Sequence, residues 1–308
     1  MQRITKKRIL IILFFLFLLL NAVAYTSAYA MTHYTVPGSV GLGKSRPRSS
    51  TLPSDVGLSY ITHRIPIDSD AWLEAWQIPT QTPPKGTVLL FHGNGGSKAA
   101  QLLPSAQSFH AMGYDAWLVD FRGVGGSSDR TTTLGIRESK DVAASLAYAQ
   151  ATELNPPFIL YGISLGSVAV LKAVADDVAK ADAIIVEQPF YTLLNAVRSR
   201  IAANNVPTFP LAELIVFWGS VQHGFNGFSH NPIDDARQIT VPTLLLQGEQ
   251  DRWTTMSEIH QIFEELKGEK QLATFPTAGH DLLISIDKVR WIEAVSQFMK
   301  SLTNLTTT

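Results

Sequence analysis

The fold that this sequence predicts follows from residues 157–170, which are Pro157-Phe158-Ile159-Leu160-Tyr161-Gly162-Ile163-Ser164-Leu165-Gly166-Ser167-Val168-Ala169-Val170. The apolar run at 158–161 suits a strand that is covered on both faces, and the almost wholly apolar residues 165–175 suit a buried helix. Between them lies a G-x-S-x-G pentapeptide centred on Ser164. Side chains at 162 and 166 would collide with the strand or the helix, so glycine is required there. In this setting the motif predicts a strained corner that presents the Ser164 hydroxyl above the sheet edge as a nucleophile. The alternative is an ordinary loop of small residues.

Composition narrows the class of protein. The chain has 308 residues, 45% of them hydrophobic, which is enough for a large core. Its net charge is −1, and because four positive charges lie within residues 3–8, the rest of the chain is mildly acidic. With no basic stripe, a nucleic-acid partner is not expected. The absence of cysteine excludes disulfides, thiolate metal sites and a cysteine nucleophile.

Residues 1–30 form an apolar segment that allows two interpretations. A secretory signal has a basic start, an apolar core and a small-x-small site, here Ala28-Tyr29-Ala30. A membrane anchor needs about 20 mostly apolar residues. We favour the uncleaved anchor because Tyr25, Tyr29 and Tyr34 suit the far membrane interface. Both interpretations place the remaining chain outside the cytoplasm, since the positive cluster stays inside. If the segment is instead a signal that is cleaved near Ala30, the mature protein is secreted or periplasmic.

The rest of the chain alternates strand and helix. We expect a linker at 31–57, one domain at 58–302 and a polar tail at 303–308. Expected strands lie at 58–65, 72–78, 87–91, 115–119, 158–161, 183–186, 243–246 and 271–275, and expected helices at 99–112, 136–150, 165–175, 256–267 and 285–302. This alternation predicts an α/β fold with a mostly parallel central sheet and helices on both faces. The aromatic-rich residues 190–229 predict a small helical cap, whose apolar side chains serve either packing or the wall of a pocket for an apolar chain.

Three reactive side chains follow three different strands. In an open α/β sheet, ligands bind beyond the carboxyl ends of the strands. Ser164 follows the strand at 158–161, Asp251 the strand at 243–246 and His280 the strand at 271–275. A serine hydroxyl needs a base, which His280 can supply, and an acid such as Asp251 would hold the imidazole tautomer. We therefore predict a Ser164–Asp251–His280 triad, with Glu187 as the rival acid; the five-residue loop leading to Asp251 gives Asp251 the freer reach.

The predicted active site has a fourth component, the glycine-rich loop Phe91-His92-Gly93-Asn94-Gly95-Gly96. A tetrahedral intermediate needs fixed N–H donors, and we predict an oxyanion hole made by the backbone N–H groups of Asn94 and Leu165. A dinucleotide loop is disfavoured because Lys98 occupies the third glycine position.

A second glycine-containing loop, residues 121–128, also departs from the dinucleotide-binding pattern, because Ser128 occupies the third glycine position. It is interpreted as structural, with Asp120 and Arg122 locking the strand end. A metal-ligand role for His92 is disfavoured, since no second histidine lies at ligand spacing. We expect neither a cofactor nor a metal.

Together these motifs resemble one family. Residues 58–302 look like the α/β-hydrolase superfamily, and they are similar to its BEM46-like and serine-aminopeptidase-like branch through His92-Gly93-Asn94-Gly95-Gly96, Asp120-Phe121-Arg122-Gly123, Gly162-Ile163-Ser164-Leu165-Gly166, Gly248-x-x-Asp251 and Gly279-His280. The resemblance implies an α/β-hydrolase fold with Ser164, Asp251 and His280 as the triad. For a peptidase we find no acid pair in the cap to hold a substrate ammonium, since Glu213 stands alone among apolar residues.

The leading hypothesis is a serine hydrolase of carboxylic esters, with acyl lipids and thioesters considered because of the apolar cap and the membrane segment. The partners expected are a small-molecule or lipid ester and the membrane. Alternatives are an aminopeptidase-like enzyme and a non-catalytic binding or scaffold protein on the same fold. Epoxide or haloalkane hydrolysis is disfavoured because those relatives carry aspartate where this chain has Ser164.

Overall fold

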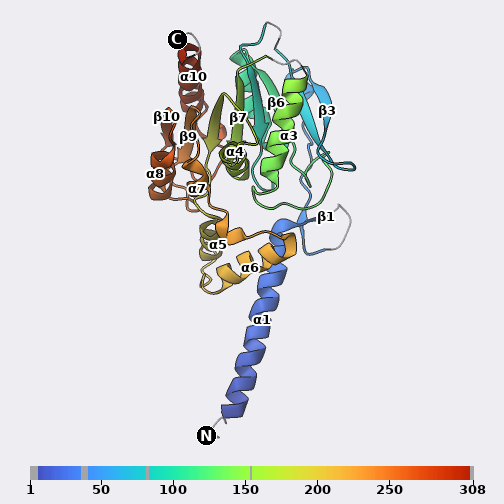
Figure 1. Cartoon of the computed structure of the whole chain (residues 1–308), viewed down its shortest axis with the longest axis vertical. Coiled ribbons are helices and arrows are strands. Elements are labelled where there is room, and N and C mark those ends of the chain that lie inside the picture. The colour runs from blue at the N-terminus through green and yellow to red at the C-terminus, as the bar shows by residue number, and fades with distance from the viewer. Residues whose placement is uncertain (1–5, 36–40, 81–82, 153–154, 306–308) are drawn as a thin grey trace.

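An eight-stranded sheet forms the centre of the body (Figure 1). The computed structural model describes residues 6–35, 41–80, 83–152 and 155–305. Strand order is β10-β9-β8-β7-β5-β6-β4-β3; β4 pairs antiparallel with β3 and β6, and the other neighbours are parallel. The strands are β3 (Ile61–Pro66), β4 (Trp72–Ile78), β5 (Thr87–Phe91), β6 (Asp115–Val119), β7 (Phe158–Ile163), β8 (Ala183–Glu187), β9 (Thr243–Gly248) and β10 (Lys270–Phe275).

Helices cover both faces of this sheet. One face packs on α3 (Glu138–Ala151), α4 (Leu165–Ala175), α7 (Pro232–Ala236) and α8 (Met256–Glu265), and the other on α2 (Leu103–Ala111), α9 (Leu283–Ile286) and α10 (Lys288–Leu305). Along β5, Leu89 and Phe91 enter the first core and Val88 and Leu90 the second. Because successive strand side chains point to opposite faces, a strand buried on both sides must be apolar throughout. The predicted α/β fold with a mainly parallel sheet is confirmed.

Several predicted boundaries were wrong. The helix expected at 99–112 is divided into a π-helical turn, η2 (Lys98–Leu102), and α2. Pro104 explains the division, because it has no N–H to continue an i→i−4 ladder and is tolerated only in the first turn of a new helix. The helix expected at 285–302 is interrupted at Asp287, whose φ of −142° is not helical, and α10 continues through Leu305 into the expected tail.

The predicted linker also holds more structure than expected. It contains a two-stranded parallel ladder, β1 (Tyr34–Thr35) with β2 (Lys44–Ser45), and a 3₁₀ turn, η1 (Pro53–Val56). β3 begins at Ile61 rather than at residue 58. Of the linker, residues 36–40 lie outside the described residues.

A helical insertion lies between β8 and β9, and we call it the cap. It consists of α5 (Leu193–Ala202), α6 (Leu211–His223), η3 (Gly227–Ser229) and the connection to α7. Its buried residues form a third apolar cluster that includes Phe190, Leu193 and Ile215. Figure 1 shows the cap at the end of the body from which the N-terminal helix projects.

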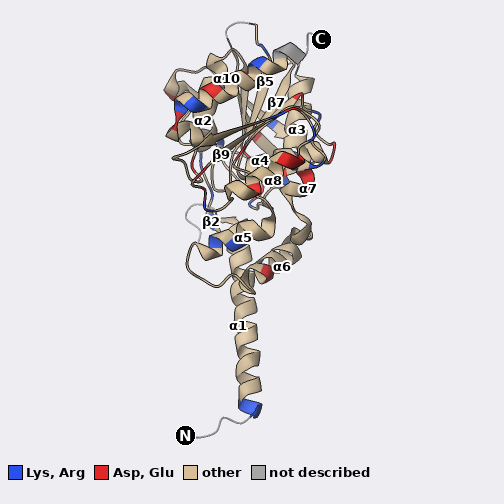
Figure 2. Cartoon of the chain, turned by 90° about the vertical axis from the view of Figure 1, so that its left-hand side faces the viewer, with Lys and Arg blue, Asp and Glu red and all other residues tan. Residues whose placement is uncertain are grey.

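That helix, α1 (Lys6–Thr32), is the one helix among the described residues that is long and apolar enough to cross a membrane by length and composition. Basic residues lie at its free end, and no charge follows along the rest of the helix (Figure 2). Its second half packs on α6: Ala24 and Ala28 are buried, and the indole Nε1 of Trp218 donates to Oδ1 of Asn21 at 3.1 Å. α1 is therefore part of the apolar core of the cap.

Candidate active site

Ser164 lies at a sharp corner between β7 and α4. Its φ of 51° and ψ of −108° are outside the regions that L residues prefer, and such strain costs about 1–3 kcal/mol, which the surroundings must offset. The Ser164 amide donates to the carbonyl of Glu187 at 2.7 Å, which holds the corner in place. A Cβ atom at Gly162 would lie 2.4 Å from the carbonyl carbon of Gly166, and one at Gly166 would lie 2.2 Å from the carbonyl oxygen of Phe91. The collision expected from the sequence is thus present at both glycines.

The structure brings Ser164, His280 and Asp251 together. Nε2 of His280 lies 2.9 Å from Oγ of Ser164, and Nδ1 lies 2.7 Å from Oδ2 of Asp251. The carboxylate can only accept, so Nδ1 carries the proton and Nε2 is left to accept from the serine hydroxyl. This geometry can remove a proton from Ser164 as the hydroxyl attacks an electrophile.

Asp251 is held as an ionised group. Oδ1 accepts from the amides of Trp253 at 2.7 Å and Thr254 at 3.2 Å, and Oδ2 also accepts from Nε2 of Gln247 at 3.1 Å. Burial alone would raise the pKa of this carboxyl, but the hydrogen bond and charge of His280, with the two amides, hold its pKa below the usual value.

Glu187, the rival acid, has a different environment. It is fully buried: Oε2 accepts from the hydroxyl of Tyr161 at 2.7 Å and from Nε1 of Trp291 at 3.1 Å, and Oε1 accepts from the amide of Leu283 at 3.0 Å. Burial raises the pKa of Glu187 despite these donors. Its contacts fasten α9 and α10 to the sheet, and it is Asp251 that bonds to His280.

The two predicted oxyanion donors border Ser164. Asn94, Ser164 and Leu165 line one cavity. Leu165 is the first residue of α4, where backbone N–H groups have no partner in the preceding turn and the helix dipole is positive. The side chain of Asn94 is oriented by the hydroxyl of Tyr34, which donates to its Oδ1 at 3.3 Å. The donor role of the two amides remains a prediction.

Tyr34 corrects one argument for the membrane anchor. We expected it at the far membrane interface, but it is buried beside Gly123 and Asn94, and burial raises its pKa. Tyr25 instead contacts the ring of Trp218 edge-on, and Tyr29 stacks on His33. A local pattern of aromatic residues did not indicate which tyrosine turns inward.

His92 is a structural residue. Nδ1 is 2.8 Å from the carbonyl of Gly93, and Nε2 accepts from the amide of Phe121 at 3.1 Å. Burial lowers the pKa of its imidazole, so the ring is neutral with both nitrogens engaged. It ties the loop after β5 to the loop after β6.

Buried ion pairs lock the end of β6. Asp120 accepts from the amide of Lys98 at 2.7 Å and pairs with its ammonium, which also lies 2.6 Å from Oε1 of Glu74. Arg122 pairs with Asp141. Lys98, which the sequence interpretation used only to reject a phosphate loop, therefore anchors this network.

Two cavities meet at Ser164, and they differ in character. One is mainly apolar and is lined by Met31, Leu134, Ser164, Leu165, Phe190, Leu193, Ala196 and Val197, together with Asn94 and Arg200. The other is polar and is lined by residues that include Lys44, Gln188, Arg200, Trp253, His280 and Asp281. The guanidinium carbon of Arg200 lies 4.5 Å from the centre of the Trp253 ring. The sequence interpretation missed Lys44, Arg200 and Met31, which lie far from the motifs along the chain and match no pattern.

Glu213 is not isolated as expected. Its Oε1 accepts from Nη2 of Arg198 at 2.5 Å, an ion pair between α6 and α5. A carboxylate already paired within the cap is poorly suited to bind a substrate ammonium.

The sheet order, the serine corner after β7 and the cap between β8 and β9 define an α/β-hydrolase. The chain belongs to the serine aminopeptidase S33 family (Hydrolase_4), whose model matches residues 82–232 and 228–287.

Individual relatives are distant but cover most of the chain. The uncharacterized protein YqkD of Bacillus subtilis is 23% identical over 234 residues, which are 74% of this chain and 75% of that protein. Protein bem46 of Schizosaccharomyces pombe is 23% identical over 222 residues, covering 71% and 68% respectively. The esterase Pf2001 of Pyrococcus furiosus has a similar structure, with a TM-score of 0.71 at 20% identity over 87% of this chain and 98% of that chain. These matches confirm the resemblance to the BEM46-like branch.

Proposed function

We propose that this protein is a serine hydrolase that cleaves carboxylic esters through an acyl-enzyme formed on Ser164. The observation that carries the proposal is His280, which bonds to Ser164 through one ring nitrogen and to Asp251 through the other. This is the arrangement that a hydroxyl nucleophile, its base and the orienting acid require.

The reaction follows from these contacts. Nε2 of His280 takes the proton as Oγ of Ser164 attacks the ester carbonyl, and the amides of Asn94 and Leu165 receive the oxyanion. His280 then gives the proton to the leaving oxygen, the ester C–O bond breaks and the alcohol departs. Water, activated by His280, releases the acid and restores Ser164. Asp251 stays ionised and stabilises the imidazolium in both steps.

The two cavities favour an ester over a peptide. An acyl group on Ser164 would lie against the apolar side chains of the first cavity, and the leaving alcohol would then occupy the polar cavity with Lys44 and Arg200. An aminopeptidase must instead bind a substrate ammonium, and the polar cavity presents the cations Lys44 and Arg200 beside the carboxylate of Asp281. The family description names a serine aminopeptidase, and that reaction is the second candidate.

A fluorophosphonate probe tests the nucleophile. The wild-type protein should be labelled and Ser164→Ala should not, whereas Ser257→Ala on the exposed surface of α8 should label like the wild type. Labelling of Ser164→Ala at the wild-type level would refute the assignment, and an unlabelled, folded wild type would favour a scaffold role. Turnover of p-nitrophenyl esters but not of alanine p-nitroanilide would separate esterase from aminopeptidase.

We also propose that α1 is retained and anchors the protein to a membrane. Ala24 and Ala28 are buried against α6, so cleavage after Ala30 would uncover the apolar core of the cap. N-terminal sequencing of the protein from membranes tests this: a mature chain beginning at Met31 would contradict retention.

A further inference from the structure

The length of α1 that is clear of the cap is too short to cross a bilayer. Asn21 bonds to Trp218 of α6 and Ala28 lies beside Gly219 of α6, whereas residues 9–19 are exposed. The segment that precedes Asn21, residues 9–20, has about 12 residues and measures about 18 Å at a rise of about 1.5 Å per residue. The hydrocarbon layer is about 30 Å thick, and tilting a helix only increases the shortfall. If the basic residues 6–8 mark one surface, the other surface lies close to Ala28, at the level where α6 crosses α1.

The cap carries exposed apolar side chains on α6 and on the loop before it. On α6, Phe217 and Val221 are exposed and lie one helical turn apart, and Val206 and Phe209 are exposed on the loop before it. In both views α6 and this loop lie beside the place where α1 leaves the body (Figures 1 and 2). We call these four residues the cap apolar face. Because α6 packs against α1, these side chains belong to elements that adjoin the exposed apolar helix, and exposed apolar patches mark interaction sites.

Two hydrogen bonds join polar groups of α1 and α6, although Oε1 of Gln222 is buried without a partner among the described residues. Asn21 accepts from Nε1 of Trp218, and Nε2 of Gln222 donates to the carbonyl of Tyr25 at 2.9 Å. Hydrogen bonds between helices satisfy side chains that would otherwise be unpaired in hydrocarbon.

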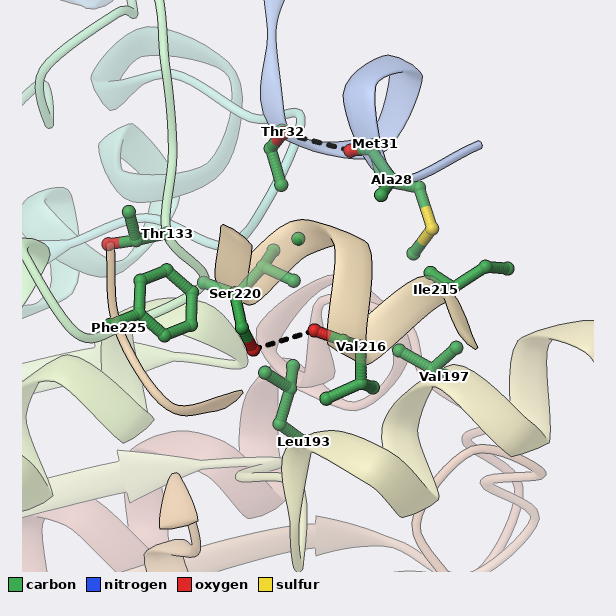
Figure 3. A pocket seen from close by; sticks show the side chains of 12 residues that line it. Ala28, Met31, Thr32, Thr133, Leu193, Val197, Ile215, Val216, Ser220 and Phe225 are labelled. Atoms are coloured by element: carbon green, nitrogen blue, oxygen red, sulfur yellow. Dashed lines mark hydrogen bonds between the residues drawn. The ribbon is translucent and has the colours of Figure 1, made fainter. Parts of the chain in front are cut away.

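Figure 3 shows a second apolar cavity, which lies between α1, α5 and α6. It is bounded by Ala28 and Met31 of α1, Val197 of α5 and Gly219 and Ser220 of α6. Met31, Leu134, Leu193 and Val197 line both this cavity and the apolar cavity at Ser164. These two cavities therefore adjoin and mark a line of apolar side chains, here called the path, from Ser164 to the contact between α1 and α6; at about 30 and 20 Å³ they would have to widen to admit an acyl chain.

We propose that the cap apolar face inserts into the membrane leaflet nearest to the cap and that acyl chains of lipid esters enter from the bilayer along this path to Ser164. The proposal rests on the proposed esterase function for its chemistry and on the retention of α1 for its geometry. The bilayer is the occupant because the face continues the anchor and compensates for its missing length.

Fluorescence quenching tests the insertion independently of catalysis. The chain has no cysteine, so Phe217→Cys and Val221→Cys can each carry one environment-sensitive fluorophore in the full-length protein, reconstituted in phosphatidylethanolamine–phosphatidylglycerol vesicles. Val178→Cys, equally exposed after the far end of α4, is the matched control. We expect lipids spin-labelled near the top of the acyl chain to quench positions 217 and 221, and aqueous cobalt to quench position 178. Quenching of 217 and 221 by cobalt to the same extent as 178 would overturn the insertion.

Substrate chain length tests the path. A Cβ atom at Gly219 has its nearest neighbour, Cβ of Ala28, at 3.9 Å, so a larger side chain there would enter the second cavity far from Ser164. For Gly219→Leu we expect kcat/KM for a palmitoyl ester to fall at least about tenfold more than for an acetyl ester, since single methylenes in an apolar pocket change rates by about 10–200-fold. Gly219→Ala should give a smaller difference. An equal change for both esters would overturn the path. A wild-type protein that the fluorophosphonate does not label would instead overturn the proposed esterase function.

Discussion

The Nε2 atom of His280 lies 2.9 Å from the Oγ atom of Ser164, although 116 residues separate them in the chain. Their loops follow β10 and β7, and two further strands, β8 and β9, lie between these in the sheet. Asp251 follows β9 and bonds to the other side of the imidazole. The pairing of parallel strands at a common edge thus creates a contact that no local segment contains.

Neutralising the two candidate acids should have different effects. Asp251→Asn should lower kcat by about 10⁴-fold, because an amide cannot hold the same imidazole tautomer or stabilise its charge. Glu187→Gln should retain kcat within about tenfold but lose about 1–3 kcal/mol of stability, because its amide would face donors from Tyr161, Trp291 and Leu283. Ester kinetics and thermal unfolding of both variants measure this. A larger loss of kcat in Glu187→Gln would reverse the assignment.

A methyl group at the serine corner should unfold the protein. In Gly162→Ala the new Cβ would lie 2.4 Å from backbone atoms of Gly166, and neither backbone can move without breaking β7 or α4. We expect a loss on the order of 4 kcal/mol or more, which is exceptional for one substitution. In Gly219→Ala the new Cβ has its nearest neighbour at 3.9 Å, so this variant should stay within about 1 kcal/mol of the wild type, because alanine favours helices. Equal stability of the two variants in denaturant titrations would contradict the steric argument.

Breaking the buried pair at β6 should be costly. Lys98→Met leaves Asp120 charged and fully buried, for which we expect a loss of about 3–5 kcal/mol in the free energy of unfolding. The control is Lys172→Met, which removes the pair with Asp176 on the surface of α4 and should cost less than about 1 kcal/mol. Urea unfolding of both variants provides the comparison, and similar losses would mean that burial does not decide the outcome here.

Acid should destabilise the fold through His230. Burial lowers the pKa of its imidazole to about 4, and its Nε2 lies 3.0 Å from the carbonyl of Leu134. Between the unfolded value near 6.5 and the folded value, the unfolded chain binds more protons, so stability falls as pH decreases. From pH 7 to 4.5 this single group should cost about 2 kcal/mol.

His230→Gln retains a donor for Leu134 but cannot titrate, so it should remove that part of the pH dependence. Chemical unfolding at several pH values measures both proteins. An identical slope for the two would show that other groups control the acid sensitivity.

Local patterns were sufficient for the sheet and for the serine corner. An apolar run of strand length, followed by two glycines around Ser164 and an apolar helix, is a short-range signal, because strand burial and steric exclusion act between neighbours in the chain. Because Ser164, Asp251 and His280 each follow a parallel strand, the sequence also placed the three side chains at one edge. Two helix boundaries were not predicted, because they are set by Pro104 and Asp287 and not by the periodicity of apolar residues.

Tertiary structure decided what surrounds this site. Tyr34 lies inside the body against Asn94, Lys98 is buried with Asp120, and Lys44 and Arg200 share the polar cavity. Trp218 bonds to Asn21 across 197 residues and makes the N-terminal helix a wall of the cap. The sequence by itself determined the fold and the three residues that meet at its edge, since short-range sterics and strand order encode them. The environment of that edge depends on contacts between distant segments, which form only when the whole chain has packed.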